Sequence, residues 1–449
     1  MTTPSAVVGR TDGGTATRAI TVEALHRFAG RALGGVLSLL ALHVAVRHFG
    51  AGPWGEIVAA SAWVGIFAVL GEFGIGTAGA RDLPEPQAGS PTARSALFVT
   101  GLASSLVAVV AMVLGGVAVY HARPGILRLV LLLAPMVPFA VIWTIGGTLL
   151  STYRKSNLRG ALDVLSSALV FGTALAVVEG RLGTSWYAAG VACSTAVTGA
   201  LAVVLVARVA PVKLAAGRLR EDVVARVVAT RVVGIVVVAN LLYAYADTFV
   251  LSLLATTTQV GYYGVAAQVA GFVMTVPLLV LNPAVGRFLV ADRDGREKIL
   301  QYLLDVLVGG VLPGAAVLYV VSHPVIELIA GRAGGGATAP FALLLVATVL
   351  LFASSPVVSA LVWTKHEGAA ARIYLLALAV NIGANVALDP SLGARGAALA
   401  MIASEAVIAV AGLWAYRART GFSPRLRVPL VSAGLAAGIV VCGELAWHA

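Results

Sequence analysis

Apolar residues occur along this chain in runs of about 20, separated by short polar segments. A run of this length can cross the roughly 30 Å hydrocarbon core of a bilayer as a helix. Each run therefore predicts one membrane-spanning helix, and none shows the short alternating pattern of a membrane β-barrel. The thirteen predicted spans are about 28–46, 55–76, 95–120, 126–150, 160–179, 185–207, 227–254, 261–290, 299–321, 338–362, 370–388, 396–416 and 428–447.

The composition leads to the same fold class, an all-α polytopic membrane bundle. Of the 449 residues, 59% are hydrophobic and 11% are charged, whereas a soluble protein carries about 25% charged residues. No segment between the spans is long enough for a soluble domain, and no Walker or dinucleotide motif is present. These features exclude an ATP-driven pump with its own nucleotide domain. They also disfavour a membrane glycosyltransferase, so we expect a non-enzyme without cofactors.

The positions of the charged residues predict the orientation. With the N-terminus in the cytoplasm, 25 of the 31 Lys and Arg residues fall on the inner side, as the positive-inside rule requires. Thirteen spans then place the C-terminus outside, and we expect a multi-pass cell-membrane protein. The net charge of +11 does not indicate nucleic-acid binding, because the basic residues lie in short loops between spans.

Three further features argue against a metal site, a removable signal peptide and a purely structural role. Cys193 and Cys442 lie within apolar runs and have no redox or metal-site spacing, so no metal is expected. The polar N-terminal residues lack the apolar core and cleavage site of a removable signal peptide. Polar residues aligned within the spans argue against a purely structural membrane scaffold.

A weak internal repeat divides the chain in two. With an offset of 206 residues, three positions match: Gly55 with Gly261, Ala60 with Ala266, and Arg81 with Arg287. A six-helix repeat returns the chain to the same side, and such repeats usually enclose a substrate path. The predicted parts are a tail (1–24), a first six-helix lobe (25–208), an inner loop (209–226), a second six-helix lobe (227–420) and an additional helix (421–449).

Polar side chains inside the predicted spans recur at helical spacing, so they share helix faces. A charge near the bilayer centre costs about 2.5–3.5 kcal/mol on insertion scales, so these faces should point to a hydrated interior. The stripes are Asn240, Tyr243 and Asp247; Gln268, Thr275 and Asn282, with Pro277 predicted to kink that helix; Tyr374, Asn381 and Asn385; and, in the first span, Arg31 and Ser38.

Each of these residues also has a structural interpretation. Single Asn and Gln residues often link neighbouring helices, and Arg31 and Asp163 could extend from the inner ends of their spans towards the lipid headgroups. For Glu405 the two interpretations are equally supported. For Asp247 the functional one is favoured, because the stripe of Asn240 and Tyr243 leads to it.

Several motifs resemble those of a known family. "RHFGAGPWGEIVAASAW" (47–63) is followed by "GEFGIGTAGARDL" (71–83), and the second half carries Asp247 and then "GYYGVAA" (261–267). "STYRKSNLRGALDV" (151–164) follows the fourth predicted span, and "PVIELIAG" (324–331) follows the ninth. Over about residues 25–420 this order resembles bacterial polysaccharide flippases of the O-antigen type. These belong to the multidrug/oligosaccharidyl-lipid/polysaccharide exporter superfamily, whose members have 12 to 14 helices.

The resemblance implies two six-helix lobes around a central cavity that opens alternately to each side. The implied activity is flipping of an undecaprenyl-pyrophosphate-linked oligosaccharide to the outer leaflet. A cation-coupled multidrug or metabolite exporter of the same superfamily is the alternative. The expected partners are the lipid-linked glycan, membrane lipids and a coupling proton or sodium ion, with a glycan polymerase or glycosyltransferases as candidate protein partners.

A hypothesis about the site follows. Arginine side chains would attract the pyrophosphate, while amides and tyrosine would bond sugar hydroxyls. The predicted cavity residues are Arg31, Ser38, Arg81, Asn240, Tyr243, Gln268, Thr275, Arg287, Asn381 and Asn385, and the candidates for the coupling ion are Asp247 and Glu405.

Overall fold

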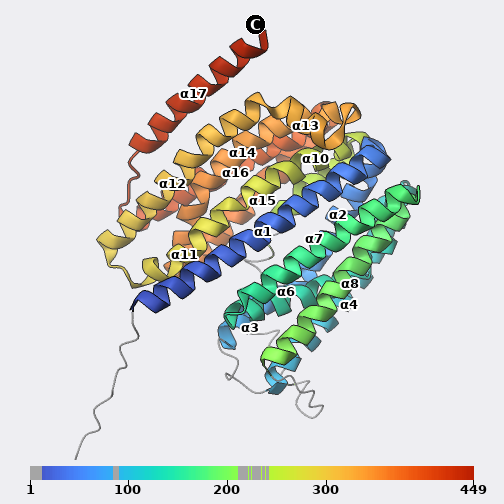
Figure 1. Ribbon diagram of the computed structural model, residues 1–449, viewed down its shortest axis with the longest axis horizontal. Coiled ribbons are helices and arrows are strands. Elements are labelled where there is room, and N and C mark those ends of the chain that lie inside the picture. The colour runs from blue at the N-terminus through green and yellow to red at the C-terminus, as the bar shows by residue number, and fades with distance from the viewer. Residues whose placement is uncertain are drawn as a thin grey trace, which may run out of the picture.

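The computed structural model is helical and contains no strand in the residues that it describes (Figure 1). These are residues 13–83, 91–210 and 242–448, with isolated positions between 221 and 238. Side chains are described from residue 29 onward, except at 81, 82, 282, 333 and 446–448. The predicted all-α fold is therefore confirmed.

The helices follow one another with short connections. Their bounds are α1 Gly13–Phe49, α2 Ala51–Glu72, α3 Ile75–Asp82, α4 Pro91–Tyr120, α5 Pro124–Leu133, α6 Met136–Thr152, α7 Ser156–Glu179, α8 Thr184–Val209, α10 Thr257–Met274, α11 Val276–Val290, α12 Arg293–Val320, α13 Ser322–Ala330, the 3₁₀ helix η1 Arg332–Ala337, α14 Thr338–Trp363, α15 Glu367–Leu392, α16 Ala394–Thr420 and α17 Arg427–His448. The segment Leu242–Leu254 is also helical, and we call it the Leu242 helix.

The number of spans agrees with the sequence. The described residues contain eleven helical segments long and apolar enough to cross a membrane, and the pair α5–α6, bent by 45°, makes a twelfth. The remaining predicted span, 227–254, is described continuously only as the Leu242 helix. The protein is thus a polytopic helical membrane bundle with about thirteen predicted spans.

Two groups of helices make up the bundle. Helices α1 to α8 pack mainly against one another, and α10 to α16 do the same. The largest contact between the groups joins α2 to α10, and a smaller one joins α1 to α13. Helix α17 packs along α12 at the edge of the bundle (Figure 1). The exact lobe boundaries given above remain a prediction.

The long segment of α10 and α11 is interrupted where the sequence predicted a kink. Helix α10 ends at Met274, and α11 begins at Val276 with Pro277 in its first turn. Proline has no backbone N–H and its ring clashes with a continuing helix, which accounts for the break at Thr275. The break lies beside two of the cavities described below.

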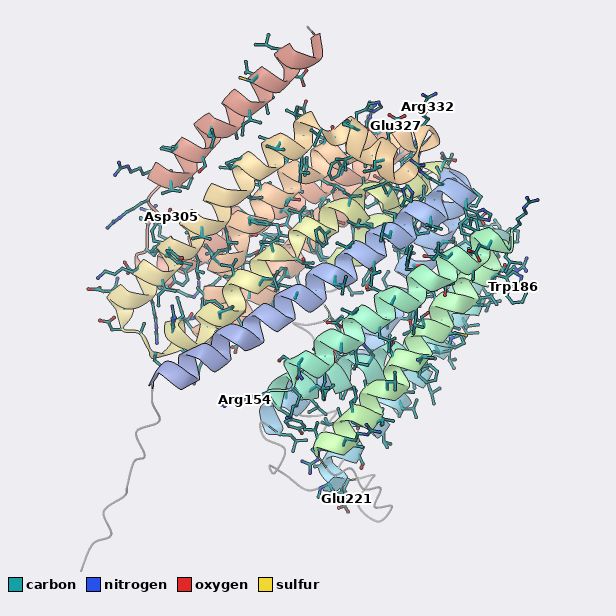
Figure 2. The ribbon with its side chains drawn as sticks, viewed as in Figure 1. Arg154, Trp186, Glu221, Asp305, Glu327 and Arg332 are labelled. Carbon is teal, nitrogen blue, oxygen red and sulfur yellow. The ribbon has the colours of Figure 1, made fainter. Side chains whose placement is uncertain are left out.

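The two ends of the bundle are identified by the loops that they carry. Figure 2 shows Trp186, Glu327 and Arg332 near one end and Arg154 and Glu221 near the other. The charge pattern assigns the first end to the outside and the second to the cytoplasm. We call them the predicted outer end and the predicted inner end.

Candidate functional site

The two groups of helices meet at the predicted outer end through a crossing of α2 and α10. A Cβ atom added to Gly55 would overlap the Thr257 carbonyl and lie 2.8 Å from the backbone nitrogen of Gly261. A Cβ atom added to Gly261 would overlap the carbonyl of Ala51. The two glycines that the internal repeat aligned therefore contact each other, and the backbones approach too closely for any side chain.

Polar contacts also join the two groups of helices at the predicted outer end. The Arg123 guanidinium donates to the backbone carbonyl of Ser252 near the end of the Leu242 helix. The Tyr120 hydroxyl lies 2.8 Å from the Ser252 hydroxyl. On the other side of the crossing, Arg47 of α1 donates to the Leu328 carbonyl of α13 at 3.1 Å. Each contact joins the first group of helices to the second, so the predicted outer end is closed.

A cavity of about 690 Å³, the central cavity, lies between the two groups towards the predicted inner end. Its walls come from α1, α6 and α7 on one side and from the Leu242 helix, α10 and Thr275 on the other. The lining residues are Arg31, Gly34, Gly35, Ser38, Leu39, Trp143, Arg159, Asp163, Ser166, Ser167, Tyr245, Gln268, Gly271, Phe272 and Thr275.

The charges of the central cavity are mainly basic. Arg31 and Arg159 line it together with one carboxylate, Asp163, whose charge interacts with both of theirs. The Arg159 guanidinium also lies over the Trp143 ring, 5.6 Å from its centroid, a geometry suited to a cation–π interaction. The cavity therefore carries one positive charge in excess.

Two aromatic rings of the second group rest on glycines of the first. The Phe272 ring occupies the space that a side chain on Gly35 would need, and the Tyr245 ring does the same at Gly65. Both rings line the central cavity. Farther along α1, the Ser38 hydroxyl donates to Ser167 of α7 at 3.3 Å.

A second cavity of about 440 Å³ lies within the second group of helices, and we call it the second-half cavity. It borders the central cavity at Gly271, which lines both. Asp247 lies in its wall with 4% of its surface exposed. Its carboxylate accepts hydrogen bonds from the Tyr263 hydroxyl and, at 2.7 Å, from the Thr248 backbone N–H.

Glu405 lines the same cavity and also has a tyrosine donor. Its carboxylate accepts a hydrogen bond of 3.0 Å from the Tyr243 hydroxyl and one of 3.5 Å from Ser354. Glu405 is 2% exposed, and among the described residues no Lys or Arg lines the second-half cavity. Buried carboxylates normally have paired charges or several donors, so both acids lie where a cation or a proton would be stabilised.

A third cavity, the outer pocket, opens at the predicted outer end and measures about 780 Å³. Its wall includes Glu56, Gln259 and Asp389. Asp389 is 1% exposed, neither of its carboxylate oxygens has a hydrogen-bond partner, and its charge interacts with that of Asp247. The side-chain oxygen of Asn385, one turn earlier on α15, is also buried without a partner.

These oxygens belong to a potential cation site rather than a cluster of transition-metal ligands. No group of three or more His, Cys, Asp or Glu residues occurs in the described part of the chain. Carboxylate and amide oxygens are the donors that hard cations prefer. The pair of Asp247 and Asp389 lies between the outer pocket and the second-half cavity.

The structure brings four of the predicted cavity residues together in the central cavity. They are Arg31 and Ser38 on α1, Gln268 on α10, and Thr275 at the break after it. Tyr243 lines the second-half cavity instead, as do both candidates for the coupling ion.

Three other predicted cavity residues lie elsewhere. Asn381 and Asn385 are fully buried and line none of the three cavities, because Asn381 donates to Ser404 at 3.1 Å and Asn385 donates to the Asn381 carbonyl at 2.7 Å. In this structure Asn381 therefore links α15 to α16, and its place on the substrate path remains a prediction. Arg287 is exposed near the end of α11 and lines none of the three cavities. Asn240, and the side chains of Arg81 and Asn282, lie outside the described residues.

The predicted site residues did not include Glu56 and Arg123 of the outer pocket, nor Arg159 and Asp389, and the sequence held a signal for the last two. Arg159 lies four residues before Asp163, so its position on the same face of α7 was visible in the sequence. Asp389 continues the stripe of Asn381 and Asn385 by one more turn. It was excluded because the predicted span stopped at residue 388, before Pro390.

Comparisons with known proteins agree with this architecture. Residues 28–290, more than half of the chain, match the family described as "Polysaccharide biosynthesis protein". The chain belongs to this family. No curated protein sequence matches it.

Solved structures resemble the fold of this chain over nearly its whole length. A lipid II flippase, MurJ, in an inward closed conformation has a TM-score of 0.67 at 12% identity, with 95% of this chain and 99% of that chain covered. An inward-facing multidrug resistance MATE transporter of the MOP superfamily also has a TM-score of 0.67, at 17% identity, with 89% and 98% covered. A MOP superfamily transporter from Pyrococcus furiosus has a TM-score of 0.59 at 14% identity, with 89% and 95% covered. These structural neighbours are a flippase and two transporters, and the likeness shows that this chain shares their fold.

Proposed function

We propose that this protein flips an undecaprenyl-pyrophosphate-linked oligosaccharide from the inner to the outer leaflet by alternating access. The observation that carries the proposal is the central cavity, which lies between the two halves and carries Arg31 and Arg159 towards the predicted inner end. Before transport, the pyrophosphate of the lipid-linked substrate lies at that surface of the membrane. Its negative charge and the hydroxyls of its sugars cannot cross hydrocarbon without a polar path.

The chemistry of the cavity suits such a head group. Arginine forms short, charge-assisted hydrogen bonds to phosphate oxygens, often two at a time. Ser38, Gln268 and Thr275 offer donors and acceptors to sugar hydroxyls, and Trp143 offers a flat ring against which a sugar can pack. The closed outer end and the cavity near the inner end describe the state that receives substrate from the inner leaflet.

We further propose that a cation, either sodium or a proton, drives the cycle from a separate site. Asp247, Asp389 and Asn385 would bind it, since Asp389 has no hydrogen-bond donor and Asn385 retains a free oxygen. Glu405, in the second-half cavity, is the second candidate position for the ion. The protein would act in the cell membrane with its N-terminus in the cytoplasm, and glycosyltransferases or a polymerase would supply and consume the glycan.

A cation-coupled drug or metabolite exporter is the alternative, and one observation favours it. The second-half cavity contains two buried acids, three tyrosines and an otherwise mainly apolar lining, which is a suitable environment for an organic cation. The basic central cavity opposes this reading, because an organic cation would meet Arg31 and Arg159 there.

Reconstitution separates the two functions. Purified protein in liposomes should transfer a fluorescent polyprenyl-pyrophosphate oligosaccharide between leaflets, and a double substitution, Arg31→Ala with Arg159→Ala, should abolish this transfer. Arg154→Ala, in the loop before α7, is the matched control. Cation-dependent efflux of an organic dye cation, without glycolipid transfer, would instead establish the exporter.

A further inference from the structure

The cation site and the closed outer end share one helix, α10. Tyr263 donates its hydroxyl hydrogen bond to Asp247 across the interface with the Leu242 helix. Two residues earlier on α10, Gly261 rests on the backbone of α2 at Ala51. An α-helix rises about 1.5 Å per residue, so the two contacts lie within one helical turn and move together.

We propose that Tyr263 couples the cation site to the outer gate, defined as the crossing of Gly55 and Gly261. Its hydrogen bond to Asp247 fixes α10 against the Leu242 helix, in the position in which Gly261 meets α2, and so keeps the gate closed. A cation bound to Asp247 shares the charge of that carboxylate, so the bond weakens and α10 separates from α2. Tyr263 is therefore a positioning residue that acts through the Asp247 carboxylate.

The strength of this contact depends on the charge of its acceptor. A hydrogen bond to an ionised carboxylate is about twice as strong as one between neutral groups. Tyr263 is 2% exposed and Asp247 is 4% exposed, so water does not compete for the bond. Among the described residues, the other ionisable groups around Asp247 are Asp389 on α15 and, in the second-half cavity, Tyr243, Tyr374 and Glu405. None of them is basic, so an arriving cation is the change that most directly alters the charge of Asp247.

The gate itself depends on the absence of side chains. Gly55 and Gly261 are in backbone contact, and the next glycine of α10 on this face, Gly264, lies under the Val58 side chain. Close backbone approach at small residues is a common way for membrane helices to associate. Such a contact is stable only at one separation, so a small shift of α10 removes it completely. The polar contacts of Arg123 and Arg47 then have to break as well.

The inference rests on the cation site of the proposed function, but a distance measurement tests it independently of glycan transfer. In a background carrying Cys193→Ser and Cys442→Ser, spin labels are placed at Trp186→Cys and Arg332→Cys. These two exposed residues lie at the predicted outer end on different halves (Figure 2). Pulsed electron resonance on the protein in liposomes then reports the distance across the gate, in choline chloride and in sodium chloride, each at neutral and at acidic pH.

For the otherwise unmodified protein we expect a short distance in choline chloride at neutral pH. Sodium or acid should produce a population at longer distance. Tyr263→Phe should raise that longer population severalfold without added cation and should remove the response to it. Tyr262→Phe is the matched control, because the Tyr262 ring contacts Gly336 rather than Asp247. It should behave like the unmodified protein. Gly55→Ala should populate the longer distance under all conditions.

Two results would overturn the coupling. One is a Tyr263→Phe protein whose distances and cation response equal those of the Tyr262→Phe control. The other is an unmodified protein whose distances neither sodium nor acid changes. Failure of glycolipid transfer together with the expected distance changes would refute only the proposed substrate. Normal transfer with an unresponsive gate would refute only the coupling.

Discussion

The central cavity and the second-half cavity border each other at Gly271 but differ in charge and in exposure. The central cavity lies between the two halves and is basic, with an exposed Arg31. The second-half cavity lies within one half, and its two carboxylates are almost completely buried. A cavity between halves changes shape when the halves move, whereas a site within one half moves as a unit. The central cavity is therefore suited to a large anionic substrate, and the second-half cavity to a small cation that drives transport.

The largest expected effect concerns the basic central cavity. Arg31→Ala combined with Arg159→Ala removes two charged donors, each worth about 1.5–3 kcal/mol when it bonds a charged partner. Because about 1.4 kcal/mol corresponds to a factor of ten, glycolipid transfer should fall at least about tenfold for each. Arg287→Ala, outside the described cavities, should cause a much smaller loss. Equal losses would show that the central cavity has no special role.

Substitutions at the proposed cation site should impair transport in a different way. Asp389→Asn keeps the size of the side chain but removes the charge that has no hydrogen-bond partner in the structure. We expect the stimulation of transfer by sodium or by a proton gradient to disappear, while the affinity for the glycolipid stays within about twofold. Initial transfer rates with and without a cation gradient measure the first quantity, and equilibrium binding measures the second. Loss of glycolipid affinity would place Asp389 on the substrate path.

Glu405→Gln should have a smaller effect than Asp389→Asn. The Tyr243 hydroxyl can still donate to the remaining side-chain oxygen, and the new amide nitrogen can donate to the Ser354 hydroxyl, so folding should be preserved. If Glu405 takes up the cation after Asp247, coupled transport should slow severalfold but not stop. The measurement is the initial rate of cation-driven glycolipid transfer. A complete loss would make Glu405, rather than Asp389, the principal cation ligand.

Asn381→Ala tests whether the buried amides belong to either cavity. Removing this side chain leaves the Ser404 hydroxyl without its Asn381 donor and takes away the oxygen that accepts from Asn385. We expect a loss of about 1–3 kcal/mol in stability, seen as a lower melting temperature of the purified protein. Transfer measured well below that temperature should be nearly unchanged. Reduced transfer by a fully folded variant would return Asn381 to the substrate path.

The smallest effect is expected for α17. This helix packs along α12, and its side chains are mostly exposed. Shortening the chain after residue 424 should leave transfer and cation stimulation within about twofold of the full chain. The same two assays measure this change. A large loss would give α17 a part in the cycle.

The fold could be predicted largely from the sequence, because burial in a bilayer requires long apolar runs with internal hydrogen bonds. The position of Pro277 likewise predicted the helix break, since proline acts on its own helix. The site was predicted only in part. Helical spacing showed that Arg31 and Ser38, or Gln268 and Thr275, share faces, but not which faces meet. It could not show that Asn381 points to Ser404 rather than to the cavity, because that depends on the neighbouring helix. Asp389 was missed because the predicted span ended at residue 388, one residue before it.

The central claim is that the cavity between the halves binds an anionic lipid-linked glycan, and equilibrium binding tests it most directly. The purified protein is titrated with a polyprenyl-pyrophosphate oligosaccharide and with a glycolipid that has the same sugars and an uncharged linkage. We predict that the pyrophosphate compound binds at least about tenfold more tightly, and that Arg31→Ala with Arg159→Ala removes this preference. Equal affinity for the two lipids, or a preference that survives the double substitution, would contradict the account.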